Sequence, residues 1–236
     1  MDGTVILLHG LGRTSRSMAA LASSIDAAGH PTRNLDYRSR KRTVRECAEE
    51  VSSQLGDLRV GDPVIGVTHS MGGVVLRSLA SRFNWQGVVM LAPPNHASSL
   101  AAWSSRIAPV RWIMGPACEE LGREPHLPDP PKPCGVIVGT RGATLDNPPS
   151  WLAAARGLFA VDEVHDGTVS LREAMHPAVT DVAMVNASHT RIMDHPETVA
   201  LVLKFLSTGG FGTAGMEPAE AELRTVSESL TAIGDS

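Results

Sequence analysis

Short apolar runs rich in β-branched residues alternate along this chain with longer stretches of helical period. A run that is apolar throughout is typical of a strand buried on both faces, and strands separated by helices form a parallel sheet. The expected strands are residues 5–8, 32–37, 63–68, 87–91, 135–139 and 182–186. The pattern therefore predicts an α/β domain, with about six mainly parallel strands and helices on both faces.

Apolar residues spaced three and four positions apart predict helices between the first strands, at residues 15–28 and 44–55, and further helices are expected later in the chain. The expected helices are residues 15–28, 44–55, 71–82, 149–156 and 196–206. A proline-rich stretch, residues 121–133, predicts an extended surface connection that leads directly into a core strand. We expect one domain over residues 1–211, followed by a polar tail over residues 212–236 that is flexible or marginally helical.

Charge and composition argue against several classes of partner. With 21 basic and 25 acidic residues the formal net charge is −4, and 4% of the residues are aromatic. Neither binding to nucleic acid nor attraction to an anionic membrane is favoured by these values. No apolar run reaches the ~18 residues that span a bilayer, so we expect no stable membrane insertion. The first residues lack the features of a signal peptide, which predicts a cytoplasmic protein.

Cysteine usage predicts neither disulfides nor a metal site. The three cysteines, Cys47, Cys118 and Cys134, are an odd number without CxxC spacing. We expect them to be reduced thiols with a structural role. The sequence contains nothing that sets the oligomeric state.

The stretch from Val64 to Gly73 is the most informative in the chain. An apolar strand runs into Ser70, and a helical pattern begins at once. This is the context of a nucleophile elbow, in which a serine hydroxyl is exposed above the sheet at a strained backbone position. Gly72 supplies the small residue that the turn needs two positions later. Thr68 stands where the consensus G-x-S-x-G has its first glycine, a position that tolerates a modest side chain if the opposing helix leaves room.

A serine nucleophile needs a base and an acid that orients the base. The base candidate is His189, which follows the last predicted strand, and the acid candidate is Asp166 in an Asp-Gly turn. Other histidines and acidic residues compete for these roles, namely His165, His176, His195, Asp146, Asp162 and Glu163.

Backbone N–H groups are the candidates for an oxyanion hole. One belongs to Met71, directly after the serine, and one to Leu11, in a glycine-rich turn after the first strand. We expect His9 to fix that turn by hydrogen bonds and His69 to pack beside the elbow.

Three further residues are candidates for contacts with substrate. Arg13, Asn95 and His96 follow predicted strands, and open α/β sheets bind ligands at the carboxyl ends of their strands. The alternative is that all three serve only loop structure.

At these residues the sequence resembles the small α/β-hydrolases of the lipase and esterase superfamily, of the compact lidless bacterial type related to inositol-deacylase-like domains. The resemblance runs from about Val5 to Phe211, and its motifs are residues 9–13, 68–73, 91–95, 166–169 and 188–193. It implies an α/β-hydrolase fold with six strands and no large cap domain. It also implies Ser70 as nucleophile, His189 as general base and acid, Asp166 as its orienting acid, and Leu11 and Met71 as oxyanion donors, with no metal or organic cofactor.

We therefore expect a serine carboxylesterase that hydrolyses small esters with short to medium acyl chains. The short connection between Leu91 and Val136 predicts an open, shallow site without a large lid. An apolar rim is expected from Leu100, Trp103, Ile107, Trp112 and Ile113. Alternatives remain open: a lipase on longer acyl glycerols, an acyltransferase, amidase or thioesterase with the same triad, or a non-catalytic binding protein on this fold.

Overall fold

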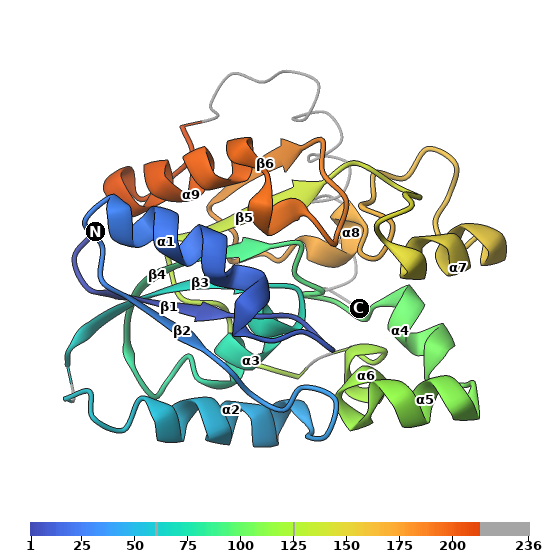
Figure 1. Cartoon of the computed structure of the whole chain (residues 1–236), viewed down its shortest axis with the longest axis horizontal. Coiled ribbons are helices and arrows are strands. Elements are labelled where there is room, and N and C mark those ends of the chain that lie inside the picture. The colour runs from blue at the N-terminus through green and yellow to red at the C-terminus, as the bar shows by residue number, and fades with distance from the viewer. Residues whose placement is uncertain (60, 125, 213–236) are drawn as a thin grey trace.

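A computed structural model describes residues 1–59, 61–124 and 126–212. The predicted C-terminal tail therefore lies, apart from Gly212, outside the described residues. Six parallel strands form one sheet in the order β2-β1-β3-β4-β5-β6 (Figure 1). Their bounds are β1 Thr4–Leu8, β2 Thr32–Leu35, β3 Pro63–His69, β4 Asn84–Leu91, β5 Cys134–Gly139 and β6 Asp181–Val185. All six predicted strands are confirmed.

The predicted helices are present, and additional short ones occur between them. The expected helices are η1 Ser15–Met18 with α1 Ala19–Ala27, α2 Val44–Gln54, α3 Met71–Ser78, α7 Pro148–Arg156 and α9 Pro196–Thr208. The additional ones are α4 Ser99–Ser104, α5 Ala108–Met114, α6 Pro116–Leu121, α8 Leu171–Ala174 and η2 Ile192–Asp194. Helix α3 is shorter than predicted, because the chain after Ser78 continues in tight turns up to Arg82. None of the helices in the described part of the chain is long and apolar enough to cross a membrane.

Helices cover both faces of the sheet, which explains why most of the strands are apolar; the edge strand β2, Thr-Arg-Asn-Leu, is mainly polar and half-buried. Val5 and Leu7 of β1 pack on the face covered by α1 and α9. Ile6 and Leu8 alternate to the other face, where α2, α3 and α8 pack. Both layers are buried, so the inner strands β1, β3, β4 and β5 contribute apolar side chains to two cores.

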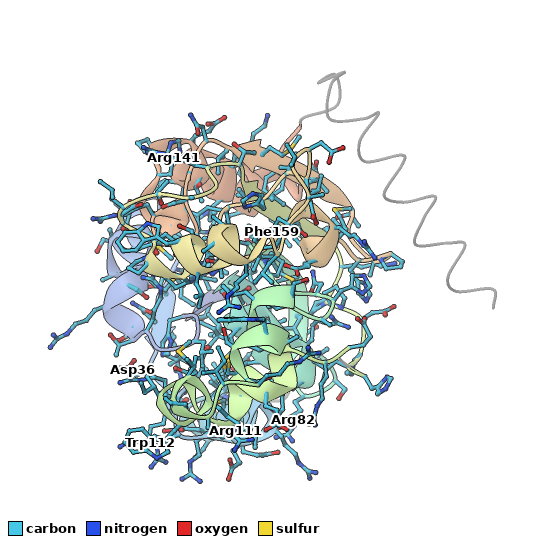
Figure 2. All side chains as sticks on the ribbon, turned by 90° about the vertical axis from the view of Figure 1, so that its right-hand side faces the viewer. Asp36, Arg82, Arg111, Trp112, Arg141 and Phe159 are labelled. Atoms are coloured by element: carbon cyan, nitrogen blue, oxygen red, sulfur yellow. The ribbon has the colours of Figure 1, made fainter. Side chains whose placement is uncertain are left out.

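Helices α4, α5, α6 and α7 gather on one side of the molecule, the right-hand side of Figure 1. Helices α4 to α6 follow the carboxyl end of β4, and α7 follows that of β5. Figure 2 looks at the molecule from this side, with α7 above and the three shorter helices below. They are too small to form a large cap domain, but they add a wall to the edge at which a parallel sheet binds ligands.

Candidate active site

Ser70 forms the turn between β3 and α3. Its backbone has φ 52° and ψ −124°, which is a strained conformation for a residue with a side chain. The N–H of Ser70 donates to the carbonyl of Leu91 at 2.9 Å, which ties the turn to the end of β4. A Cβ atom on Gly72 would lie 2.4 Å from the carbonyl oxygen of Leu8, so only glycine lets α3 start this close to β1. The predicted strand, turn and helix are all present.

Gly73 compensates for the threonine that replaces the first glycine of the elbow pattern. Thr68 is fully buried, and its Oγ1 has no hydrogen-bond partner among the described residues. A Cβ atom on Gly73 would lie 3.3 Å from that oxygen. The missing side chain at position 73 therefore makes the room that the threonine needs.

His189 and Asp166 form a close pair. Nδ1 of His189 lies 2.6 Å from Oδ2 of Asp166, a carboxylate with no exposure to solvent. The other oxygen of this carboxylate accepts the backbone N–H groups of Thr168 at 2.9 Å and Val169 at 2.8 Å. Gly139 makes the approach possible, because a Cβ atom there would lie 2.8 Å from Cβ of Asp166. These contacts hold the carboxylate so that Nδ1 of the imidazole donates to it.

Asp146, the competing acid, has other partners. Its Oδ2 accepts the hydroxyl of Ser188 at 3.2 Å and lies 3.6 Å from Nε of Arg191. Its neighbour Asn147 is a residue that sequence reasoning missed. The buried amide of Asn147 donates to the carbonyl of Asp166 at 3.3 Å, and nothing in the sequence pattern marks that role.

The N–H groups of Leu11 and Met71 lie after the ends of the neighbouring strands β1 and β3. Leu8 pairs with Thr68 in the register of these strands. A Cβ atom on Gly10 would lie 3.2 Å from Cβ of Ser70, so the turn after β1 closely approaches the serine. Within the described residues neither N–H has a hydrogen-bond acceptor. Both donors remain available to a ligand.

His9 holds the turn from within, as the sequence predicted. Its ring stacks on Tyr37 with a centroid distance of 4.1 Å, and the Tyr37 hydroxyl donates to the carbonyl of His9. Nδ1 of His9 lies 2.9 Å from the carbonyl of Gly10. Burial lowers the pKa of His9, which favours the neutral imidazole.

His69 links the elbow to the loop that carries His189. Its ring is buried, and Nε2 lies 3.0 Å from the backbone carbonyl oxygen of His189. Burial holds the pKa of His69 well below its usual value, with a smaller contribution from the neighbouring His189. The neutral ring therefore donates from Nε2 to this carbonyl.

Ser70 and His189 open into the same cavity, which has a volume of about 710 Å³. One wall is mainly apolar and comes from α4 to α6, with Leu100, Ala101, Ser104, Val110, Met114, Cys118 and Leu121. A more polar region contains Arg13, Asp146, Asn147 and Thr190.

The predicted apolar rim is largely wrong. Of its five residues only Leu100 lines the cavity. Val110 and Met114, four positions apart on α5, share the helix face that meets the cavity. Trp112 lies between them in sequence, is 86% exposed, and is at the outer edge of the molecule in Figure 2. Trp103 instead packs against Arg156 of α7, whose guanidinium carbon lies 4.9 Å from the ring centroid.

The three candidate substrate contacts separate in space. Arg13 lines the cavity that contains Ser70, whereas Asn95 and His96 do not. Asn95 is buried, donates to the carbonyl of Ala174 at 2.8 Å, and accepts on its own carbonyl from the buried Arg77 at 3.0 Å. For Asn95 the structural alternative therefore holds.

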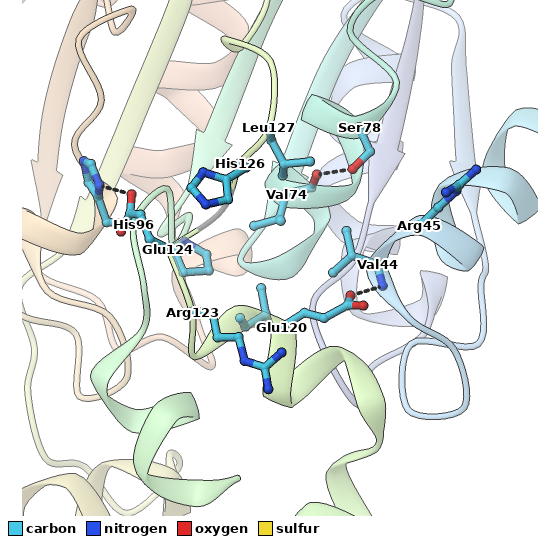
Figure 3. A pocket seen from close by; sticks show the side chains of 12 residues that line it. Val44, Arg45, Val74, Ser78, His96, Glu120, Arg123, Glu124, His126 and Leu127 are labelled. Atoms are coloured by element: carbon cyan, nitrogen blue, oxygen red, sulfur yellow. Dashed lines mark hydrogen bonds and ion pairs between the residues drawn. The ribbon is translucent and has the colours of Figure 1, made fainter.

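His96 lines a second cavity of about 290 Å³ (Figure 3). Nδ1 of His96 lies 2.7 Å from Oε1 of Glu124. The other oxygen of this carboxylate, Oε2, accepts the N–H of Ala97 at 3.1 Å. His96 thus serves the loop after β4 and lies outside the cavity at Ser70.

The fold is shared with solved hydrolases at low sequence identity. The mature form of a lipase from Bacillus licheniformis matches with a TM-score of 0.63 at 19% identity, over 87% of this chain and 92% of that one. A metagenomic carboxyl esterase has a TM-score of 0.62 at 18% identity, over 80% of this chain and 65% of that one. A methylesterase from Arabidopsis has a TM-score of 0.55 at 15% identity, over 87% of this chain and 99% of that one.

Neither a protein-family profile nor a curated protein sequence matches the chain. The relationship to the solved structures is therefore one of fold.

Proposed function

Because the chain has the α/β-hydrolase fold, we propose that it is a serine carboxylesterase acting on short- to medium-chain esters through an acyl-enzyme. The observation that carries the proposal is that Ser70, at its strained turn, and His189, bonded to buried Asp166, open into one cavity. Two backbone N–H groups, those of Leu11 and Met71, lie at the same end of the sheet and have no acceptor in the part of the chain that the structure describes. Nucleophile, base, orienting acid and oxyanion donors are the parts that acyl transfer requires.

The bond between Nδ1 of His189 and Asp166 leaves Nε2 of the imidazole to act as the base. Nε2 takes the proton of the Ser70 hydroxyl as Oγ attacks the ester carbonyl carbon. The oxyanion accepts hydrogen bonds from the N–H groups of Leu11 and Met71. His189 then gives its proton to the leaving alcohol, and the acyl group stays on Oγ. Water, deprotonated by His189, attacks the acyl group, so that the acid is released and the serine hydroxyl is restored.

The apolar wall supports the assignment of acyl size. The cavity of about 710 Å³ falls within the range of roughly 300–1,000 Å³ that is usual for small-molecule sites. Leu100, Val110, Met114 and Leu121 provide apolar contacts for an acyl chain on the side of α4 to α6. A single cavity of this size suits one small ester.

The test is hydrolysis of p-nitrophenyl butyrate by the wild-type protein and by Ser70→Ala. We expect Ser70→Ala to lose at least about 10³-fold in kcat, because the nucleophile is removed. Its melting temperature and circular dichroism should match those of the wild type. Ser78→Ala on the same helix, whose hydroxyl donates to Val74 at 3.2 Å, is the matched control and should stay active.

A fluorophosphonate probe should label the wild-type protein at Ser70 and leave Ser70→Ala unlabelled. Ester turnover that persists in Ser70→Ala at the wild-type rate would show that this serine is not the nucleophile.

A further inference from the structure

Two arginines that form no ion pair with any described residue flank the oxyanion turn, the glycine-rich turn around Leu11 that follows β1. Arg13 ends the turn, Arg40 lies beside it, and both line the cavity that contains Ser70. Neither forms an ion pair within the described residues. The nearby Arg38 and Arg42 each bind a glutamate of α2, at 3.1 and 3.3 Å. Unlike Arg38 and Arg42, the two arginines at the cavity therefore have no carboxylate within ion-pair distance among the described residues.

The packing of Arg40 keeps it at the cavity. A Cβ atom on Gly12 would lie 3.6 Å from Cδ of Arg40, so the aliphatic part of the side chain lies over the turn. The backbone of Arg40 is packed against Gly115, between α5 and α6, where any Cβ would clash with its carbonyl oxygen. Both neighbours are glycines with positive φ, which permits this close packing.

Arg13 is partly buried and weakly bonded. Its Nη2 has one protein acceptor among the described residues, the carbonyl of Thr190, at the long distance of 3.5 Å. Burial lowers the pKa of its guanidinium, and the charge of the exposed Asp194 opposes this. A desolvated cation of this kind is stabilised by an anion that reaches it through the cavity.

The contact with Thr190 places Arg13 on one particular side of the reacting ester. His189 must protonate the leaving alcohol, so the alcohol lies on the side of His189. Thr190 is the next residue, and Arg13 touches its carbonyl. The apolar wall of α4 to α6 is available to the acyl chain. Arg13 therefore faces the alcohol part.

Asp146 also lines the cavity and opposes this positive charge in part. Its carboxylate accepts the hydroxyl of Ser188 at 3.2 Å and lies 3.6 Å from the guanidinium of Arg191. Since Asp146 already has these partners, Arg13 and Arg40 keep their capacity to bind an anion. A guanidinium offers paired donors that match the oxygens of carboxylate or phosphate.

We propose that the preferred substrates combine an apolar acyl group with an alcohol that carries an anionic group, carboxylate or phosphate, which Arg13 binds with the help of Arg40. The inference rests on the proposed esterase activity and adds its substrate class. Arg13 thereby determines specificity for the alcohol part.

The experiment compares four acetate or succinate esters by titration of the acid released. Two carry the anion on the alcohol part, 2-acetoxyethyl phosphate and 3-acetoxypropanoate. One is uncharged, 2-methoxyethyl acetate, and one carries the anion on the acyl part, monomethyl succinate. Each kcat/KM is divided by the rate of hydrolysis in hydroxide alone, which removes differences in intrinsic reactivity. The phosphate and carboxylate arms distinguish the two kinds of anion.

We expect at least one of the two esters with an anionic alcohol part to exceed the uncharged ester by about tenfold or more, which corresponds to about 1.4 kcal/mol. The ratio of the two corrected kcat/KM values, anionic alcohol part over uncharged, should fall as salt is added, because screening weakens the attraction between the arginines and the anion. Arg13→Gln should reduce the ratio to about one, Arg13→Lys should keep part of it, and Arg40→Gln should reduce it by a smaller factor. Arg16→Gln is the matched control, since Arg16 is exposed and lies outside the cavity.

The two levels of failure can be told apart. If the wild-type protein hydrolyses neither p-nitrophenyl butyrate nor any of the four esters, the esterase function is wrong and the inference falls with it. If it hydrolyses p-nitrophenyl butyrate but none of the four esters, the inference alone is wrong. If the corrected kcat/KM of the uncharged ester equals that of the esters with an anionic alcohol part, the inference alone is wrong. A preference for monomethyl succinate, or a ratio that survives in Arg13→Gln, would also overturn it.

Discussion

Nε2 of His69 donates to the backbone carbonyl of His189 at 3.0 Å, and their ring centroids are 4.7 Å apart. The residue before the candidate nucleophile thus holds the backbone of the candidate base. The contact joins the central strand β3 to the loop after the edge strand β6. For the proposed reaction His69 would be a positioning residue, because its contact is with the backbone of His189.

Replacement of His69 by phenylalanine should lower kcat more than it changes KM. The ring volume is largely kept, but the carbonyl of His189 loses its donor, which costs about 1–3 kcal/mol for a buried acceptor. His69→Gln retains an N–H donor and should keep more activity than His69→Phe. His126→Phe, at an exposed histidine, is the control for the substitution itself. Equal kcat values for His69→Phe and the wild type would contradict the positioning role.

Asp166→Asn should lower kcat by about 10³-fold or more, because the amide favours the wrong tautomer of His189. Asp146→Asn provides the comparison, since Asp146 binds Ser188 and Arg191 instead of the imidazole. Its effect on an uncharged ester should be less than tenfold. The measurement is kcat for p-nitrophenyl butyrate, together with the melting temperature of each variant. A larger loss in Asp146→Asn would reverse the assignment of the orienting acid.

Met114→Trp should shift the acyl preference toward shorter chains. Met114 lines the apolar wall, and a larger ring there reduces the space for the acyl group. Trp112→Ala, two positions earlier on α5, should leave the preference unchanged because that side chain is 86% exposed. A series of p-nitrophenyl esters from acetate to decanoate measures the optimum for each protein. An optimum that moves only in Trp112→Ala would place the acyl site outside the cavity.

The three cysteines should be unreactive in the folded protein. Burial raises the pKa of Cys47 and Cys134 to about 12 and of Cys118 to about 11, from 9.0. Since the thiolate is the reacting form, a disulfide reagent at pH 8 should modify the protein in denaturant and spare the native state.

The same raised pKa values predict how stability changes with pH. Below pH 9 the thiols are protonated in both states, and their contribution to the free energy of unfolding is fully present. It is lost as pH rises from 9 toward 12, because the unfolded chain then releases protons that the folded chain keeps. Urea unfolding at pH 8, 9 and 10 should show this decline. For the reactivity experiment, rapid modification of all three thiols by the disulfide reagent in the native state would refute the conclusion that they are buried.

The sheet could be predicted from the sequence because most of its strands are buried on both faces and are therefore apolar. The edge strand β2 is the exception, since three of its four residues are polar and half-buried. The helices between residues 99 and 121 could not, since α4, α5 and α6 have at most seven residues each and depend on packing. The rim was misassigned for the same reason. Which face of α5 meets the cavity depends on how the helix docks, so Val110 and Met114 carry no distinguishing local pattern.

The candidate catalytic residues were more predictable than the buried residues that hold the surrounding loops. Ser70 and His189 follow strand ends and Asp166 stands in an Asp-Gly turn, and the structure brings them to one cavity or to direct contact. The partners of Asn147 and Arg77 are distant in sequence. Such contacts arise only when loops from different strands meet, and a single sequence gives no signal for them.

The strand order divides the candidate machinery between regions of unequal protection from local unfolding. Ser70 and the oxyanion turn follow β3 and β1, which have neighbours on both sides, whereas His189 follows β6, which has one neighbour. Edge elements open at a lower free energy than the centre of a sheet. Transient opening at β6 and α9 would detach the base while the elbow stays intact, so amide exchange near His189 is expected to be faster than around Ser70. We therefore expect the proposed activity to be lost reversibly before the core melts.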